Sequence, residues 1–392
     1  MIDTKRTFGA TMLITGCCIG AGMIGLPVMS ALAGFLPATA AMALVYVFTT
    51  ASGLLLLEAT LWFDREANLA SIAELTLGKA GKNATLILFM FLFYCIFVAY
   101  LDSGGLLISE MLNSLFNIEL SQKAGIVLCL GLVSAITYAG TKLVDNLNRA
   151  LVFGLAVTYF ALVSMSLPLI EKDSLAYANW ASSIAIIPIL MICFGFQNLV
   201  PSITHYLERN AKSVRIAIVI GNAIPFFIYL VWNFIILGVI PHQADLSYGD
   251  VAVVSELLQA ATPSLSILLF VKVFSLLALL TSFIPCAISF VDFVKDGFRK
   301  KLTGKGRDSI LIFAIVFVPP FICSLTYPHI FLKSLNFAGG FIDVVLFGII
   351  PSMAILIGRK IKKLAGPYQV IGGNITPLFV LTISIMILFI RL

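Results

Sequence analysis

Two apolar stretches of the chain contain residues that weaken a helix. Ile14–Pro27 places glycines at 16, 20, 22 and 25 before its proline, and Ile192–Ser202 places Gly195 between two phenylalanines, ahead of two amide side chains and a proline. A break in a helix leaves backbone N–H and C=O groups without partners. In an apolar interior only protein, water or a ligand can satisfy them. The two stretches therefore predict a place where bare peptide groups bind a small charged ligand.

An amino acid suits such a pair of breaks because it has both charges. The N-terminal end of a helix favours an anion, and freed carbonyls accept hydrogen bonds from an ammonium group. The alternative is that the glycines only let helices pack closely. The backbone groups expected to bind the ligand belong to Ile19, Gly20, Ala21, Gly22, Met23, Phe194 and Gly195.

The elements that position these residues must cross a membrane. The chain has 392 residues, of which 60% are hydrophobic and 11% charged, and its mean hydropathy is +1.07. This composition excludes a water-soluble globule. A membrane β-barrel would need short alternating segments, which do not dominate here. With about 20 apolar residues per span, the sequence predicts an all-α integral membrane protein with eleven spans, at 8–31, 35–62, 85–112, 124–141, 149–169, 182–205, 216–240, 265–296, 309–326, 338–358 and 370–391.

The basic residues indicate the direction of these spans. Most of the 25 Lys and Arg residues fall in the loops of one side when the N-terminus is placed in the cytoplasm, which is the positive-inside pattern. The C-terminus is then outside, and the first apolar run is a retained span rather than a cleaved signal. The net charge of +6 thus reflects topology, with the lipid bilayer as the partner. Scattered basic residues give no support for nucleic-acid binding.

The two weakened stretches belong to an internal repeat. Gly195 follows Gly20 by 175 residues, and the longest loops, about 63–84 and 241–264, lie at matching places. Because each group has five spans, the two copies have opposite orientations in the membrane. The predicted division is a first repeat over 1–169, a second over 182–358, and an additional span in 370–392.

Several motifs resemble those of a known family. They are GCCIGAGMIGLP, FGFQNLVPSITHYLERN, VIGNAIPFFIYLVWN, GTKLVDNLNR and ALLTSFIPCAISFVDF. They are similar to motifs of the hydroxy and aromatic amino acid permeases, the bacterial tyrosine and tryptophan permeases of the amino acid-polyamine-organocation superfamily. The similarity runs from about residue 7 to the C-terminus.

The resemblance implies a leucine-transporter-like fold with broken helices 1 and 6 and a location in the bacterial cytoplasmic membrane. It also implies uptake of an aromatic amino acid, tyrosine or tryptophan, driven by the proton gradient. A Na⁺-coupled carrier of another neutral amino acid is the alternative. Gln197 and Asn198 depart from the family's usual pair, so the choice among Tyr, Trp and Phe stays open.

An aromatic substrate needs an apolar slot with a few polar groups. The side chains that we expect to form it are Tyr94, Tyr100, Phe196, Gln197 and Asn198. Ordinary packing is the alternative for each aromatic residue, since the chain has 31 Phe and 11 Tyr.

Ionisable and hydroxyl groups within the spans are candidates for ion coupling. Asp102 lies deep in the third span, where it could relay a proton or be neutralised by Lys272. Thr281 and Ser282 could join Gly16 in a Na⁺ site; hydrogen bonding to the preceding helical turn is the alternative. Asp343 is expected at a solvated outer end.

Glu58 lies near an inner helix end, where a solvated position and a gating role are both open.

No bound cofactor or metal other than the coupling ion is expected. A channel would need a continuous polar lining. An enzyme would need a catalytic cluster, and the sequence has no nucleophile elbow, His-rich metal motif or phosphate loop.

Overall fold

The computed structural model describes residues 3–20, 22–64, 67–139, 141–239, 265–298, 307–327 and 329–391. All regular secondary structure in these ranges is helical. The helices are α1 (Thr4–Cys18), α2 (Gly22–Ala31), α3 (Phe35–Thr60), α4 (Leu69–Phe116), α5 (Gln122–Ala139), α6 (Thr141–Ser166), α7 (Lys172–Ala176), α8 (Ser183–Cys193), α9 (Val200–Tyr206), α10 (Ala211–Val239), α12 (Leu265–Phe298), α13 (Arg307–Thr326), α14 (Phe331–Phe337), α15 (Ile350–Lys360) and α16 (Ile375–Arg391). Shorter 3₁₀ pieces are η1 (Leu167–Leu169) and η2 (Gln197–Leu199), and two π-helical pieces are η3 (Ala338–Ile342) and η4 (Val344–Ile349).

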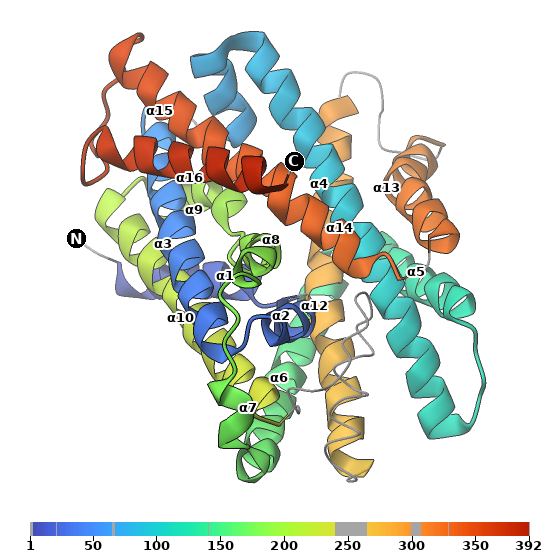
Figure 1. Cartoon of the computed structure of the whole chain (residues 1–392). Coiled ribbons are helices and arrows are strands. Elements are labelled where there is room, and N and C mark those ends of the chain that lie inside the picture. The colour runs from blue at the N-terminus through green and yellow to red at the C-terminus, as the bar shows by residue number, and fades with distance from the viewer. Residues whose placement is uncertain are drawn as a thin grey trace.

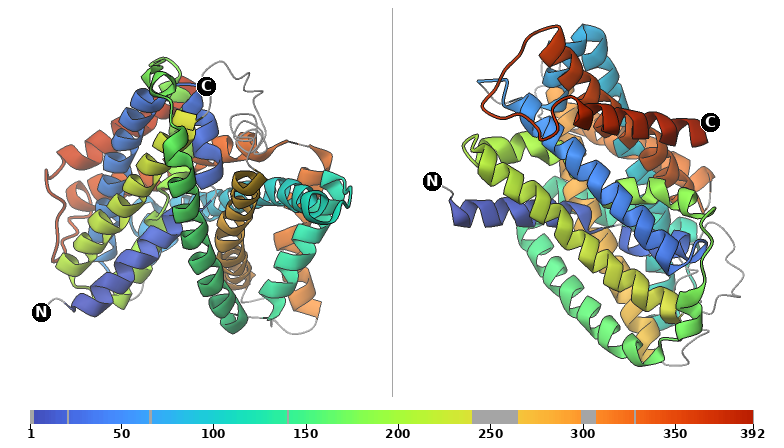
Figure 2. Two further views of the ribbon diagram at one scale, coloured as in Figure 1. Left: turned by 90° about the horizontal axis from the view of Figure 1, so that it is seen from below. Right: turned by 60° about the vertical axis from the view of Figure 1, so that its left-hand side comes forward.

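The all-helical membrane architecture is confirmed, but the count of eleven spans is not. In the part of the chain that the structure describes, nine helical stretches are long and apolar enough to cross a membrane, or ten if the bent pair α1 and α2 is one span. The predicted eleventh span is α16, which has 17 residues and is too short to be counted with them. In Figure 1 and the right view of Figure 2, α16 runs across the direction of α4 rather than along it.

A predicted loop is partly helical. The sequence places a loop at about 63–84, but α4 begins at Leu69, where the Asn68 side chain accepts a hydrogen bond from the Ser71 N–H (2.8 Å). Such an N-cap offsets the loss of partners at a helix start. Gly78 bends α4 with a φ of 78°, a left-handed conformation that favours glycine. The other long predicted loop, 241–264, lies outside the described residues.

Small residues let the helices approach closely, which is how helices associate where lipid is as apolar as their side chains. A Cβ added at Gly125 of α5 would lie 2.1 Å from the Gly105 carbonyl oxygen of α4. Helices also approach closely at a glycine in the centre of the bundle, where α8 packs against α2 and α3 (Figure 1). A Cβ at Gly25 of α2 would lie 2.9 Å from Ile189 of α8.

The span over Phe331–Lys360 changes its helical form along its length. It passes from α14 through η3 and η4 into α15, and Asp343 lies between the two π-helical pieces. At Gly339 an added Cβ would lie 1.9 Å from the Pro188 carbonyl oxygen. This part of the span is therefore pressed directly against the backbone of α8.

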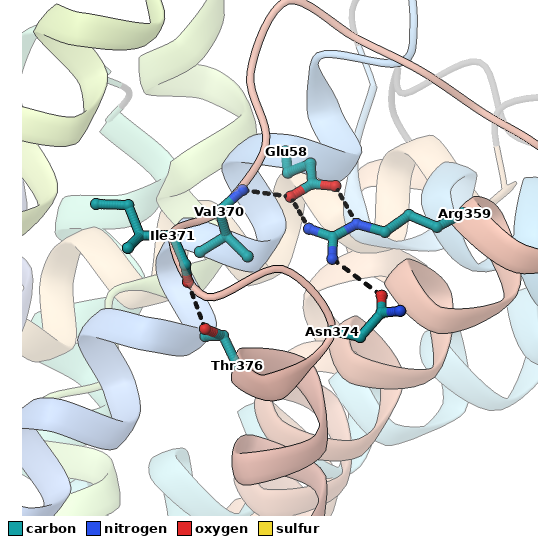
Figure 3. A network of polar contacts seen from close by, with 6 residues as sticks. All are labelled: Glu58, Arg359, Val370, Ile371, Asn374 and Thr376. Atoms are coloured by element: carbon teal, nitrogen blue, oxygen red, sulfur yellow. Dashed lines mark hydrogen bonds and ion pairs between the residues drawn. The ribbon is translucent and has the colours of Figure 1, made fainter.

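Glu58 is fully paired at one end of the bundle. Its carboxylate accepts two hydrogen bonds from the Arg359 guanidinium (2.7 and 2.5 Å) and one from the Val370 N–H (2.7 Å). Arg359 also donates to the Asn374 side chain (3.2 Å). Figure 3 shows this cluster joining α3, α15 and the segment before α16. Since the Glu58 side chain is only 3% exposed, the solvated position that the sequence allowed is wrong.

Candidate functional site

The first broken helix is α1 followed by α2. The α1 helix ends at Cys18, Ile19 is extended (φ −87°, ψ 110°), and α2 starts at Gly22 with its axis turned by 54°. The Met23 N–H donates to the Gly20 carbonyl (2.9 Å). As at any helix start, the leading N–H groups of α2 have no partner within the helix. Ala21, which the sequence assigns to substrate binding, lies outside the described residues.

The second broken helix is α8 followed by η2 and α9. The α8 helix ends at Cys193, and the Gly195 N–H donates to the Ile192 carbonyl at 3.2 Å. Pro201, at the start of α9, lacks the N–H that would continue an unbroken helix. The sequence-predicted break at 194–196 is therefore present.

The two breaks face one another. A Cβ added at Gly22 would lie 2.3 Å from the Cys193 sulfur and 2.6 Å from the Tyr229 hydroxyl oxygen. The Cys17 thiol donates to the Gly195 carbonyl (S···O 3.5 Å). Segments about 175 residues apart in sequence thus meet within hydrogen-bonding distance.

Side chains from neighbouring helices satisfy carbonyls at the first break and that of Met23, whose helical donor would be Pro27, a residue without an N–H. From α10, the Tyr229 hydroxyl donates to the Cys18 carbonyl (2.5 Å), and the Trp232 indole N–H donates to the Met23 carbonyl (2.7 Å). From α12, the Ser282 hydroxyl donates to the Ile19 carbonyl (3.3 Å). A broken helix in lipid requires such hydrogen-bond partners from the protein for its backbone groups.

A cavity of about 670 Å³ adjoins both breaks. Phe89, Phe93 and Phe347 form part of its apolar wall, and Tyr100, Asn198 and Asp343 supply polar groups. Its size and mixed lining match those of small-molecule sites, which measure about 300–1,000 Å³.

Only some of the predicted site residues line the cavity. The predicted residues that line it are Gly16, Ile19, Met23, Tyr100, Gly195, Asn198, Thr281 and Ser282. The described residues of the prediction that do not line it are Gly20, Gly22, Tyr94, Asp102, Phe194, Phe196 and Gln197.

Two aromatic residues that were predicted for the site, Tyr94 and Phe196, make contacts away from the cavity. The Tyr94 hydroxyl donates to the Ile315 carbonyl of α13 (2.8 Å). Phe196 is fully buried, and its ring lies 2.8 Å from where a Cβ at Gly53 of α3 would stand. The sequence identifies these residues by their closeness to a break but does not give the direction of their side chains.

The amide pair after the second break divides between two environments. Asn198 is exposed to the cavity. Gln197 is 1% exposed, and neither its amide nitrogen nor its amide oxygen has a hydrogen-bond partner among the described residues. Of these two amides, Asn198 is thus the one placed to contact a ligand in the cavity.

Asp102 is a structural acid in this arrangement. It is 3% exposed, and its carboxylate accepts hydrogen bonds from the Gln122 side chain (3.0 Å) and from the Phe331 N–H at the start of α14 (3.1 Å). The suggested ion pair with Lys272 is wrong, because Lys272 contacts Ser114 (2.8 Å) and Glu110 (3.8 Å) instead.

The hydroxyls predicted for a Na⁺ site line the cavity, and that of Ser282 lies beside the first break. Ser282 reaches the Ile19 carbonyl, whereas Thr281 donates to the Ala278 carbonyl of its own helix (2.9 Å). Gly16 has open space where a Cβ would stand. These three residues and the Ile19 carbonyl therefore provide oxygen atoms and room at one side of the cavity.

Asp343 is a site residue that the sequence reasoning missed. It is 2% exposed and lines the cavity, so the expected solvated outer end is wrong. The predicted span begins at 338, but the helical path begins at Phe331 and places Asp343 well inside it. Counting Phe331–Phe337 as part of the span would have revealed this depth.

Paired helix breaks around a central cavity define a class of fold that secondary transporters use. The structure of MhsT in complex with L-phenylalanine matches with a TM-score of 0.71 at 16% identity, covering 98% of this chain and 97% of that one. Mhp1, a nucleobase-cation-symport-1 family transporter with bromovinylhydantoin bound, matches with a TM-score of 0.64 at 14% identity, covering 98% and 92%. The chain thus has the leucine-transporter-like fold of membrane transporters.

Residues 3–391 match the tryptophan/tyrosine permease family, and the chain belongs to this family. The Tyrosine-specific transport system 1 of Haemophilus influenzae is 30% identical over 391 residues, which cover 98% of this chain and 96% of that protein. The Tryptophan-specific transport protein of the same organism is 27% identical over 406 residues, covering 98% and 96%. The resemblance noted in the sequence is confirmed, and the protein belongs with transporters rather than enzymes.

Proposed function

We propose that this protein is a secondary active transporter that imports tyrosine or tryptophan across the bacterial cytoplasmic membrane. In this proposal, uptake is coupled to the proton gradient, with the N-terminus inside and the C-terminus outside. The observation that supports it best is the aromatic-walled cavity beside two broken helices. Membership of a family whose relatives carry tyrosine and tryptophan supports the substrate class.

The proposed substrate lies with its charged end between the breaks. Its carboxylate binds the leading N–H groups of α2, where the helix dipole is positive. Its ammonium group binds at the Gly195 carbonyl. Its ring packs among Phe89, Phe93 and Tyr100, since offset and edge-on aromatic pairs are favourable. The proposal thus uses the cavity at both its polar and its apolar parts.

A Na⁺-coupled carrier of another neutral amino acid is the second candidate. The hydroxyls of Thr281 and Ser282, the Ile19 carbonyl and the open space at Gly16 support it, since hard cations prefer oxygen ligands. The two candidates differ in which gradient drives uptake.

Proteoliposomes containing the purified full-length protein test both candidates. Labelled tyrosine, tryptophan, phenylalanine and glutamine are supplied in turn under an inward H⁺ gradient, an inward Na⁺ gradient or neither. We expect saturable uptake of tyrosine or tryptophan that only the H⁺ gradient drives above equilibrium. Uptake driven by Na⁺ alone, or restricted to glutamine, would favour the second candidate, and no uptake in any arm would reject both.

A further inference from the structure

Three acidic side chains are almost completely buried within the described residues of the bundle, namely Glu58, Asp102 and Asp343, each at most 3% exposed. Glu58 is paired with Arg359, and Asp102 accepts hydrogen bonds from a side chain and a helix N–H. The Oδ1 atom of Asp343 has no hydrogen-bond partner in the part of the chain that is described. A buried polar atom without a partner is unusual and points to a functional role or a missing ligand.

The position of Asp343 links it to the proposed substrate. It lines the same cavity as Gly195, and its Oδ2 atom lies 3.8 Å from where a Cβ at Gly195 would stand. It also lies between η3 and η4. Short π-helical pieces inside α-helices occur often at functional sites, and here they hold a carboxylate beside the second break.

The described residues around Asp343 offer no positive charge to neutralise it. Its titratable neighbours are the thiols of Cys17 on α1 and Cys95 on α4, which are close enough to interact with it electrostatically. The α8 helix, which packs on η3, presents Gly195 there. Among the described residues, no salt bridge includes Asp343. An ionised carboxylate in this place is therefore stable only while water is next to it.

We propose that Asp343 is the group that carries the coupling proton through the transport cycle. This assignment rests on the proposed function. A proton from the outer aqueous side adds to a carboxylate oxygen, forming a neutral carboxylic acid that the closed, dry cavity can contain. When the cavity meets the inner aqueous side, the O–H bond breaks, the proton passes to water, and the carboxylate is restored.

Proton coupling at Asp343 follows from its charge and its location together. Since the neutral acid is favoured when water is excluded, closure of the cavity is linked to protonation. Asp343 lies beside the second break, with its Oδ2 atom 3.8 Å from where a Cβ at Gly195 would stand, so the neutral acid adjoins the bound substrate in the loaded state. Asp102 does not meet these conditions, because both of its carboxylate oxygens accept hydrogen bonds from the protein and it does not line the cavity.

Proteoliposomes with the full-length protein test the assignment. The variants are Asp343→Asn, which removes the proton site but keeps the shape, and Asp343→Glu, which restores a carboxylate. Asp292→Asn is the matched control, because the Asp292 side chain is 58% exposed and contacts Lys295. Three readouts are compared: exchange of labelled for unlabelled substrate without a gradient, accumulation under an inward pH gradient, and substrate-dependent acidification reported by a trapped dye.

We expect the wild type and Asp292→Asn to exchange substrate, to acidify the lumen, and to accumulate substrate up to about tenfold for each pH unit if one proton moves with each substrate. Asp343→Asn keeps exchange but neither accumulates substrate nor acidifies the lumen, and Asp343→Glu regains both. Accumulation with acidification by Asp343→Asn would overturn the assignment alone. A wild type that exchanges neither tyrosine nor tryptophan would overturn the proposed function, and the assignment with it.

Should Asp343→Asn lose exchange as well, substrate binding to the purified, monodisperse variant decides. We expect wild-type affinity to change between acidic and alkaline pH, and the affinity of Asp343→Asn to stay constant. An unchanged pH dependence in Asp343→Asn would overturn the assignment.

Discussion

The span over Phe331–Lys360 joins two regions that treat buried charge in opposite ways. At its end, Arg359 and Glu58 form a cluster with Val370 and Asn374 in which the carboxylate is fully hydrogen-bonded. Near its middle, Asp343 faces the cavity with one oxygen unpaired. The first region fixes the fold, and the second leaves groups open for a ligand. The difference indicates where substitution should affect stability and where it should affect transport.

The largest expected effect comes from breaking the paired region. Glu58→Ala leaves the Arg359 guanidinium, whose side chain is 11% exposed, without its carboxylate; removing one partner of a buried pair costs about 3–5 kcal/mol of stability. Thermal unfolding of the purified protein in detergent, read by tryptophan fluorescence, measures the loss. The double variant Glu58→Leu with Arg359→Met is the control, because apolar replacement of both partners should recover most of the stability. An unaffected single variant would contradict a structural role for the cluster.

A smaller effect should distinguish Gly20, at the first break, from Gly16, which lies inside α1. A Cβ at Gly20 would lie 2.1 Å from the Ser282 hydroxyl oxygen, whereas Gly16 has open space. Gly20→Val should therefore destabilise the protein by about 1–3 kcal/mol through overpacking. Gly16→Val should instead leave stability nearly unchanged and abolish saturable uptake by filling the cavity. Normal uptake by a well-inserted Gly16→Val protein would argue against the cavity as the substrate site.

Removing the hydroxyl of Tyr229 tests how the break is held. Tyr229→Phe leaves the buried Cys18 carbonyl without this donor, and we expect a loss of about 1 kcal/mol, typical of one hydrogen bond. Tyr159→Phe is a comparison with a more exposed bond, since the Tyr159 hydroxyl donates to the Ile228 carbonyl at 3.1 Å and its ring is only partly buried. Equal losses from both variants would show that the broken helix places no special demand on its donor.

The smallest stability effect is expected at Asp343. Asp343→Asn removes a buried carboxyl group with one unpaired oxygen. The free energy of unfolding should therefore change by no more than about 0.5 kcal/mol, and the melting temperature should stay the same or rise slightly. The same substitution at Asp102 should be clearly destabilising, because the Gln122 and Phe331 donors use different carboxylate oxygens and asparagine has only one acceptor oxygen. Differential scanning fluorimetry of both variants makes the comparison. A large destabilisation by Asp343→Asn would place Asp343 among the structural acids.

Sequence reasoning located the two helix breaks better than the directions of the side chains around them. The breaks near Gly20 and Gly195 were predictable because glycine and proline act on the backbone locally, whatever surrounds them. Tyr94 and Phe196 turn away from the cavity because packing against α13 and α3 sets their direction. Sequence spacing alone does not contain that rotation.

The position of Asp343 could not be predicted because the start of its helix was not evident from the sequence. The first turns of the span at Phe331–Phe337 contain a lysine and an asparagine, which favour a loop by composition. In the structure the Asp102 carboxylate accepts the Phe331 N–H at the start of α14, a long-range contact that a single sequence does not reveal. The shift of the span moved Asp343 from an expected surface to the interior.

The bonds from α10 to both sides of the first break limit how the protein can move. Tyr229 holds α1 at Cys18, Trp232 holds α2 at Met23, and Asn233 donates to the Ser30 hydroxyl (3.0 Å). Because α10 is hydrogen-bonded to both α1 and α2, the angle between α1 and α2 cannot open without the loss of buried hydrogen bonds. A tilt of α1, α2 and α10 together keeps these bonds and strains instead the contacts to other helices, such as Ser282–Ile19 (3.3 Å) and Cys17–Gly195 (3.5 Å).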